Sequence, residues 1–221
     1  MLSKFSKRLD PYRKDSLYQA YWALTKVVAY LVMPIKLIRY YVSNIPNKKL
    51  HIGCGSVRLQ GWINVDIHPA APLILDIKHK LPIRSDSIQL IHTEHVIEHL
   101  TLQEALGFFS EAKRILKKGG TIRIAMPDLD DIVNAYIDDW KKLDWVHWQG
   151  HQFIGSNAEM MNIAFRWWGH KYLYNKHELE RRLRQAGFTE ISFCDHGSSS
   201  LEEFCSLETR VDSTLIAEAT K

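Results

Sequence analysis

Apolar residues recur at two different periods along the chain, and the period changes near residue 45. Between residues 16 and 41 the spacings alternate between four and three, which predicts one face of an α-helix. The members of this stripe are Leu17, Tyr21, Leu24, Val28, Leu31, Ile35 and Ile38. The longest uncharged run, Val27 to Ile35, is far short of the roughly 20 residues that span a bilayer. We therefore predict a helix that does not cross a membrane, kinked at Pro34.

Beyond residue 48, short apolar runs alternate with amphipathic segments. Capping pairs at Thr101-x-x-Glu104 and Asn175-x-x-Glu178 predict two helix starts, and a further helix is predicted from Asp128 to Lys142. Lys117-Lys118-Gly119-Gly120 is predicted to end the first of these helices. Strands are predicted at about 49–52, 62–66, 73–76, 88–93, 121–126, 189–195 and 213–219.

This alternation predicts an α/β fold with a mainly parallel sheet. No helix separates the last two predicted strands, so they should form an antiparallel pair at one edge. The early connections, Ser56 to Gly61 and Ile67 to Pro72, are shorter than the dozen or so residues that a parallel crossover needs. Helices are therefore missing from one sheet face, and the N-terminal helix is a candidate to cover it. This hypothesis competes with a membrane-surface role for the same helix.

Charge is distributed unevenly between these two parts. Residues 1–49 hold ten Lys or Arg and two Asp or Glu, whereas the remaining residues hold 19 basic and 23 acidic side chains. We predict a basic helical arm at residues 1–45, joined through the segment 43–47 to one domain at residues 46–221. An anionic partner such as a membrane surface would suit the arm, although a solvated charged helix explains the same charges. Three cysteines form no paired framework, which favours a reducing, cytoplasmic location, at most peripheral to the inner membrane face.

The first predicted strand of the domain runs into a tight glycine turn, Gly53-Cys54-Gly55. The second predicted strand ends on Asp66. Glycines let the backbone approach a ligand, and an acid at a strand end accepts hydrogen bonds from a ribose. The pair therefore indicates a nucleoside site, in which Cys54 is a sterically small residue rather than a reactive thiol.

Further motifs follow in a fixed order, and together they resemble a known family. Besides Gly53-Cys54-Gly55 and Asp66, they are Asp76-Ile77, Leu81-Pro82, the tract from Ser87 to His99, and Ala112-x-Arg114-Ile115-Leu116-Lys117-x-Gly119-Gly120. The series resembles class I S-adenosylmethionine-dependent methyltransferases of the type 11 kind, which have a Rossmann-like sheet. The tracts 61–66 and 213–219 resemble a bacterial group associated with surface-polysaccharide biosynthesis. The resemblance covers residues 49–221 and leaves the arm out.

The resemblance implies S-adenosylmethionine as the cofactor and gives each motif a role. Gly53 and Gly55 would hold its methionine portion, and Asp66 would accept the ribose hydroxyls. The remaining residues that it assigns to the cofactor are Cys54 in the glycine turn, Ile67 after the ribose acid, Asp76 and Ile77 at the adenine, and Thr93 and Glu94 at the sulfonium.

Methyl transfer asks for an aligned acceptor and, for many acceptors, a base. Histidines 92, 95 and 99 cluster around the end of the fourth predicted strand, and His95 is our candidate catalytic base because it follows that strand directly. A helix-capping role is the alternative. The aromatic tract 165–172 suggests a substrate-side lid that includes Trp167, His170 and Tyr172, or else an aromatic core patch. No metal ligand is predicted.

We expect methyl transfer to an oxygen or nitrogen of a small molecule or saccharide. One alternative is a domain that binds S-adenosylmethionine without catalysis. Another is a zinc hydrolase, because His95-x-x-Glu98-His99 matches an inverted zinc-protease motif. The acidic balance of the domain argues against a nucleic-acid substrate.

Overall fold

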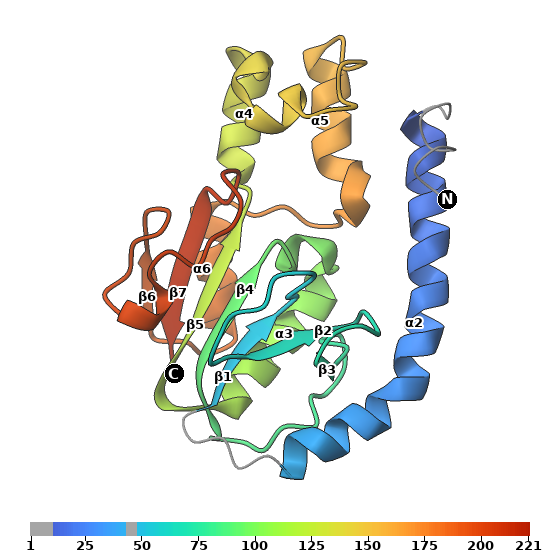
Figure 1. The fold of residues 1–221 in the computed structure, drawn as a ribbon. Coiled ribbons are helices and arrows are strands. Elements are labelled where there is room, and N and C mark those ends of the chain that lie inside the picture. The colour runs from blue at the N-terminus through green and yellow to red at the C-terminus, as the bar shows by residue number, and fades with distance from the viewer. Residues whose placement is uncertain (1–10, 43–47) are drawn as a thin grey trace.

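The computed structural model describes residues 11–42 and 48–221, and its centre is a seven-stranded sheet (Figure 1). The strand order is β3-β2-β1-β4-β5-β7-β6. Pairing is parallel from β3 to β5, whereas β7 is antiparallel to both β5 and β6. The bounds are β1 Lys48–Ile52, β2 Ile63–Asp66, β3 Leu73–Ile74, β4 Ile88–Glu94, β5 Leu116–Met126, β6 Glu190–Phe193 and β7 Leu215–Thr220. The predicted α/β fold with an antiparallel C-terminal edge pair is confirmed.

Five α-helices accompany the sheet in the described ranges. They are α2 Pro11–Val42, α3 Leu102–Ile115, α4 Leu129–Ile137, α5 Asn157–Arg166 and α6 Lys176–Gln185. The predicted capping box of α3 is present, with the Thr101 hydroxyl and the Glu104 carboxylate each accepting the other residue's backbone N–H. Asp128 and Asn175 cap α4 and α6, also as predicted. The helix expected to reach Lys142 stops at Ile137 and is followed by a short 3₁₀ turn at Trp140–Lys142.

The prediction for Lys117–Gly120 is wrong, because this segment belongs to β5. Leu116 is already extended, and Gly119 and Gly120 exchange backbone hydrogen bonds with the last residue, Lys221. Gly120 also passes close to β4, where a Cβ atom would come within 2.9 Å of the Gln89 carbonyl oxygen. The glycines therefore serve a close approach of strands rather than a helix cap.

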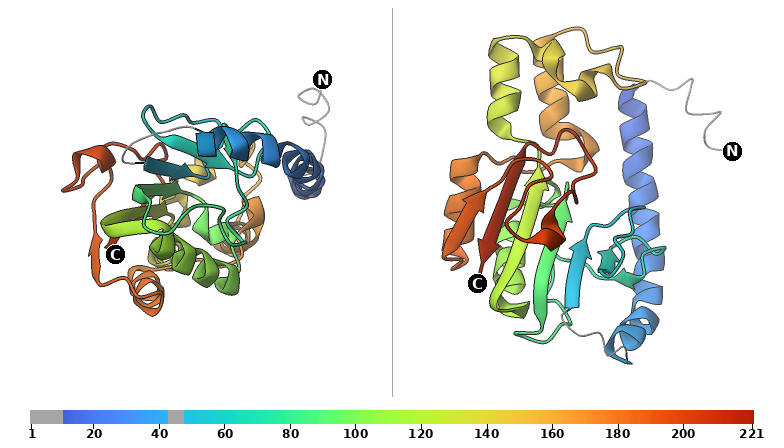
Figure 2. Two further views of the ribbon diagram at one scale, coloured as in Figure 1. Left: turned by 90° about the horizontal axis from the view of Figure 1, so that it is seen from below. Right: turned by 60° about the vertical axis from the view of Figure 1, so that its left-hand side comes forward.

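The two faces of the sheet differ in chemistry. One face is apolar and packs against α3 and α6 through residues such as Ile52, Ile91 and Ile124 (Figure 2). On the other face, one register row crosses the sheet and consists only of polar residues. In order from β2 to β6, these are Asn64, His51, His92, Arg123, Glu218 and Ser192. An apolar helix is not needed on this face, which explains how the early connections can be so short.

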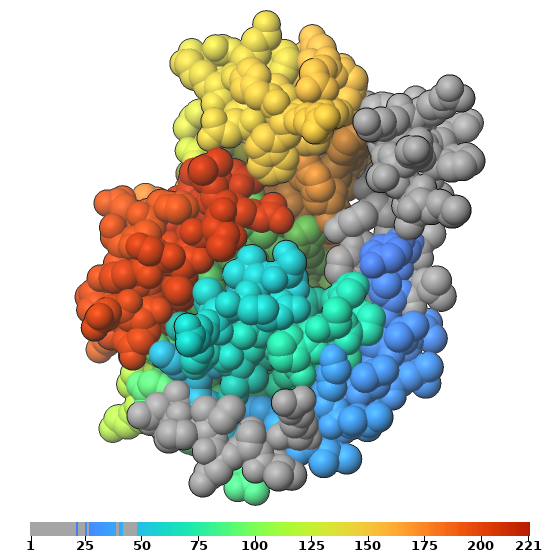
Figure 3. All heavy atoms as spheres, in the orientation of Figure 1, coloured from blue at the N-terminus to red at the C-terminus, as the bar shows by residue number. Residues whose placement is uncertain are grey.

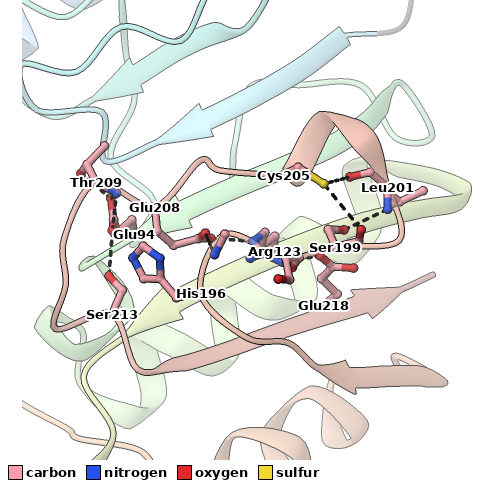
Figure 4. A network of polar contacts seen from close by, with 12 residues as sticks. Glu94, Arg123, His196, Ser199, Leu201, Cys205, Glu208, Thr209, Ser213 and Glu218 are labelled. Atoms are coloured by element: carbon pink, nitrogen blue, oxygen red, sulfur yellow. Dashed lines mark hydrogen bonds and ion pairs between the residues drawn. The ribbon is translucent and has the colours of Figure 1, made fainter.

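The chain between β6 and β7 covers the polar face (Figure 1). Arg123, fully buried on β5, donates to the Glu208 carboxylate at 2.6 Å and to the Ser198 carbonyl oxygen at 3.0 Å, and it also binds Glu218 (Figure 4). Phe204 is buried in the same segment, with its ring centroid 6.0 Å from that of Trp62. The polar face is therefore covered by the β6–β7 connection and not, as one hypothesis expected, by the N-terminal helix.

Helix α2 packs beside β3 at the edge of the sheet instead (Figures 1 and 3). Ala29 is fully buried against Ala71 and Ile74, with Val32 and Met33 beside it. All members of the predicted apolar stripe with described side chains are exposed: Tyr21, Val28, Leu31, Ile35 and Ile38. Of these, Tyr21 still reaches the domain, with its hydroxyl 3.4 Å from Nε2 of His68. The side chains of Leu17 and Leu24, and the predicted boundary at 43–47, lie outside the described residues. Among the described helices, none is long and apolar enough to cross a membrane.

Candidate functional site

Strands β1 and β4 lie next to each other where the order of strands reverses. Ligands of open α/β sheets bind outside the carboxyl ends of the strands at such a point. The glycine turn follows β1, Asp66 ends β2, and Thr93 and Glu94 end β4. Most of the residues that the sequence predicts for the cofactor therefore lie at the same edge of the sheet, at the carboxyl ends of its parallel strands.

The glycine turn is shaped by positions that only glycine fills without strain. Gly53 has a φ of +74°, and a Cβ atom there would lie 2.0 Å from Cγ2 of Val96. Gly55 also has positive φ, but a Cβ atom there would meet open space. Its backbone N–H donates to the Asp66 carboxylate at 2.8 Å, and the N–H of His68 donates to the other oxygen at 2.8 Å. Asp66 is thus fixed at the mouth of the turn, and each carboxylate oxygen keeps accepting capacity.

Cys54 is buried within the same turn, and burial raises the pKa of its thiol to about 11. A thiol with that pKa is not a nucleophile at neutral pH. The interpretation of Cys54 as a small, unreactive residue is therefore supported by its surroundings.

The predicted adenine end is bordered by the N-terminal helix. The Tyr30 hydroxyl on α2 donates to the Asp76 carboxylate at 2.6 Å, and this bond is the main cause that raises the pKa of Tyr30 to about 12. The other Asp76 oxygen accepts the Lys78 backbone N–H at 3.1 Å. Ile77 is buried beside them, and Ile67 follows Asp66 and is half-buried. The contact of Tyr30 with Asp76 was not predicted from the sequence, where the two residues are 46 positions apart.

The Glu94 carboxylate is bound by the β6–β7 connection (Figure 4). It accepts five hydrogen bonds, from the backbone N–H groups of Thr209 and Arg210 and the hydroxyls of Thr209 and Ser213. Although burial opposes it, these donors hold the pKa of Glu94 below its ordinary value. Thr93 is buried, and its hydroxyl has no partner among the described residues. Contact of both residues with a sulfonium stays a prediction.

A cavity of about 300 Å³ opens beyond the end of β4. Its walls come from the residues after β4 and β5, from the helical region between α4 and α6, and from the end of the β6–β7 connection. The lining contains three indoles, Trp145, Trp148 and Trp168. It also contains four carboxylates, Asp128, Asp131, Asp144 and Asp212, against two cations, Lys142 and Arg210.

His95 stands at the wall of this cavity in an unusual backbone conformation, with a φ of +51°. Its Nδ1 lies 3.3 Å from Oε1 of Glu98, and its Nε2 lies 3.6 Å from Oδ1 of Asp212. Nε2 has no hydrogen-bond partner among the described residues. Nδ1 faces Glu98, which does not line the cavity, whereas Nε2 faces Asp212, which does, so Nε2 is the nitrogen placed to meet an acceptor there.

Glu98 is fully buried behind His95. Burial alone would raise the pKa of its carboxyl, but the imidazoles of His95, His99 and His170 lower it to a net value below the ordinary range. Neither carboxylate oxygen has a hydrogen bond from a described residue. A buried carboxylate of this kind favours positive charge in its surroundings.

The three residues predicted for the substrate side are placed differently. His170 lines the cavity, and its Nδ1 lies 2.7 Å from the Ala164 carbonyl oxygen. Trp167 stacks on Phe153 instead, and the Tyr172 hydroxyl donates to Glu178 at 2.8 Å. Neither Trp167 nor Tyr172 lines the cavity. Trp145 and Asp212 do line the cavity, but they stand in no sequence motif and were not predicted.

The predicted zinc-hydrolase motif does not form the arrangement that such a site needs. His95 and His99 do not share an α-helix, since only a 3₁₀ turn at Ile97–His99 follows His95. The described residues that bring candidate ligand atoms within 4.8 Å of one another are Glu98, His99 and His170. His95, the first histidine of the motif, is not part of that group.

Comparison with known proteins adds a family match. A family model described as a methyltransferase domain matches residues 44–192. No curated protein matches the chain.

Solved structures of similar fold are numerous. A SAM-dependent methyltransferase from Thermotoga maritima has 16% identity and a TM-score of 0.49, with 95% of this chain and 98% of that one covered. One from Archaeoglobus fulgidus has 16% identity and a TM-score of 0.46, covering 91% and 99%. A phosphoethanolamine N-methyltransferase from Haemonchus contortus, solved with S-adenosylhomocysteine, has 15% identity and a TM-score of 0.45. There the match covers 85% of this chain but only 52% of the other.

Proposed function

The chain belongs to the methyltransferase domain family and depends on S-adenosylmethionine, and from this premise we propose that it methylates an oxygen or nitrogen of a polar small molecule, with a saccharide hydroxyl as the favoured acceptor. The observation that carries the proposal is the position of His95. Its Nε2 has no hydrogen-bond partner among the described residues, at the wall of a cavity beside the end of β4.

The residues around the glycine turn fit the cofactor. A Cβ atom at Gly55 would point into open space, so the missing side chain leaves that space to a ligand. The missing side chain of Gly53 lets the turn pack closely against Val96. The Asp66 oxygens, each held by one backbone N–H, can accept two ribose hydroxyls as well. Asp76 and Ile77 would border the adenine, and Cys54, Ile67, Thr93 and Glu94 would complete the surrounding wall.

The cofactor supplies an activated sulfonium methyl group, so the protein's part is alignment and proton removal. We assign proton removal to His95. Nε2 would take the proton of an acceptor hydroxyl as the new C–O bond forms, or the proton of an acceptor ammonium before transfer so that the nitrogen lone pair is free, with S-adenosylhomocysteine as the leaving group. Glu98 keeps Nδ1 protonated and stabilises the resulting imidazolium. Asp212, 3.6 Å from Nε2, is placed to hold the acceptor group before transfer.

The cavity lining supports an acceptor that is neutral or cationic. Four carboxylates there stand against two permanent cations, Lys142 and Arg210, beside three histidines, and carboxylates accept hydrogen bonds from hydroxyls or ammonium groups but repel anions. The three indole rings offer apolar faces on which the C–H surface of a sugar can pack. This combination favours a saccharide, in line with the resemblance of two tracts to enzymes associated with surface polysaccharides. Cytoplasmic synthesis of such a saccharide would suit the three unpaired cysteines.

Release of S-adenosylhomocysteine, measured over a panel of acceptors, tests the proposal. Neutral sugars and amino sugars should be methylated, whereas sugar phosphates of the same skeleton should react poorly. Preference for the phosphorylated member of each pair would overturn the saccharide assignment. Calorimetry with S-adenosylmethionine separates the alternative: binding without turnover of any acceptor would favour a non-catalytic domain.

A further inference from the structure

We propose that the outward face of α2 is a docking surface for an anionic lipid membrane. We define this outward face by Val27, Val28, Leu31, Ile35 and Ile38, all of which are exposed. The proposal concerns where the protein sits and does not depend on which acceptor it methylates.

Exposed apolar residues are concentrated on this helix. Leu31, Ile35 and Ile38 are 75%, 70% and 65% exposed. Of the 14 large apolar side chains that are exposed in the described part of the chain, eight belong to α2, although it is one helix among five. A contiguous apolar surface of this kind on a folded protein marks an interaction site.

The outward face of α2 is exposed because the opposite side of the helix packs against the domain. Ala29, Val32 and Met33 pack against the residues around β3. Lys36 donates to the Pro69 carbonyl oxygen at 2.8 Å, and Tyr30 donates to Asp76. Because the inner contacts include buried residues and hydrogen bonds, the helix cannot turn its stripe inward without losing them. Figure 3 shows the described part of α2 at the outer margin of the molecule.

Charge decides between a membrane and a second copy of the chain. Helix α2 itself holds five basic side chains and one acidic side chain, so two copies paired through this helix would bring like charges together. An anionic lipid surface attracts the same charges, by about 1 kcal/mol for each Lys or Arg near it. A basic helix with one apolar face and no capacity to span a bilayer is typical of interfacial membrane helices.

Co-sedimentation of the full chain with vesicles tests this surface. The wild type should bind vesicles of equimolar phosphatidylglycerol and phosphatidylethanolamine at least tenfold more tightly than vesicles of phosphatidylcholine. About 1 M NaCl, where charges are screened within about 3 Å, should weaken that binding. Leu31→Gln combined with Ile35→Gln should reduce it at least tenfold.

The matched control is Val133→Gln with Ile137→Gln, another exposed pair four residues apart, on α4. It should bind vesicles like the wild type. Thermal melting and S-adenosylmethionine titration verify that each variant is folded, and Ile38→Gln is a milder second variant if the α2 pair melts early. Equal binding by the α2 pair and the wild type, or no preference for anionic vesicles, would overturn the proposal. A concentration-dependent dimer that the α2 pair abolishes, with no vesicle binding, would identify a second copy as the occupant instead.

Discussion

At the scale of single residues, Asp66 is the side chain that we propose to bind the ribose of the cofactor. We predict that Asp66→Ala weakens S-adenosylmethionine binding about a hundredfold, since two hydrogen bonds to a charged group are lost at about 1.5 kcal/mol each. Calorimetry measures the change. Asp86→Ala, which removes an exposed carboxylate at the other end of β4, should leave the affinity unchanged. Affinity retained in Asp66→Ala would contradict the ribose assignment.

A substitution at His95 tests the methyl-transfer step rather than the binding of S-adenosylmethionine. We predict that His95→Asn lowers kcat by about 10²- to 10⁴-fold, the usual contribution of a general base, with little change in the affinity for S-adenosylmethionine. Asparagine is chosen because it tolerates the positive φ of this position. Single-turnover assays with an acceptor from the screen measure the rate. His147→Asn, at an exposed histidine outside the cavity lining, is the control. A variant as fast as wild type would leave His95 a structural role only.

At the scale of elements, Arg123 joins β5 to the segment that covers the polar sheet face. Arg123→Met should lower the free energy of unfolding by about 3–5 kcal/mol, because it leaves the buried Glu208 and Glu218 carboxylates without their partner. Urea titration measures the loss. Adding Glu208→Gln should recover part of it. Arg184→Met, which breaks an exposed pair with Glu180, should change stability by less than about 1 kcal/mol.

Helix α2 offers a paired test of its two sides. Ala29→Glu should destabilise the protein by about 3 kcal/mol, because it forces a larger, charged side chain into a fully buried position against Ile74. Val28→Glu, one residue away and exposed, should change stability by about 0.5 kcal/mol or less. Thermal melting at matched protein concentration compares them. Equal melting temperatures would mean that α2 does not pack on β3.

The sequence predicted the order and type of the elements because caps and periodicity are local properties. It did not predict the polar sheet face, although the alternation was visible in Leu50-His51-Ile52 and Ile122-Arg123-Ile124. The polar side chains on that face are stabilised by partners such as Glu208, which pairs with Arg123 from 85 positions away in the sequence. Asp212 and Trp145 reach the cavity through the same kind of distant folding, so no local pattern could reveal them. The prediction of a helix-ending turn at Gly119 was wrong for a related reason. The backbone N–H of Gly119 donates to Lys221, which is distant in the sequence.

At the scale of the whole molecule, the polar row gives the fold a dependence on pH. Burial lowers the pKa of His92 to about 4 and also lowers the pKa of His51, whose ring lies beside it with centroids 5.3 Å apart. In the unfolded chain both histidines titrate near their ordinary pKa of about 6.5. The buried glutamates with lowered pKa values, such as Glu98 and Glu208, lose their stabilising effect only below about pH 4.5. Between pH 7 and pH 5, the two histidines therefore determine how the free energy of unfolding changes with pH.

In that interval the unfolded state binds protons that the folded state does not, so the free energy of unfolding falls as the pH falls. From the shift of His92 alone, the loss between pH 7 and pH 5 should be about 2 kcal/mol, and His51 adds to it in the same direction. Urea titrations at the two pH values measure the difference. His92→Gln removes the titrating group from the row, so its stability should depend on pH by about 2 kcal/mol less. A variant with the same slope as the wild type would show that the pKa of His92 is the same in the folded and the unfolded protein, and would contradict the prediction.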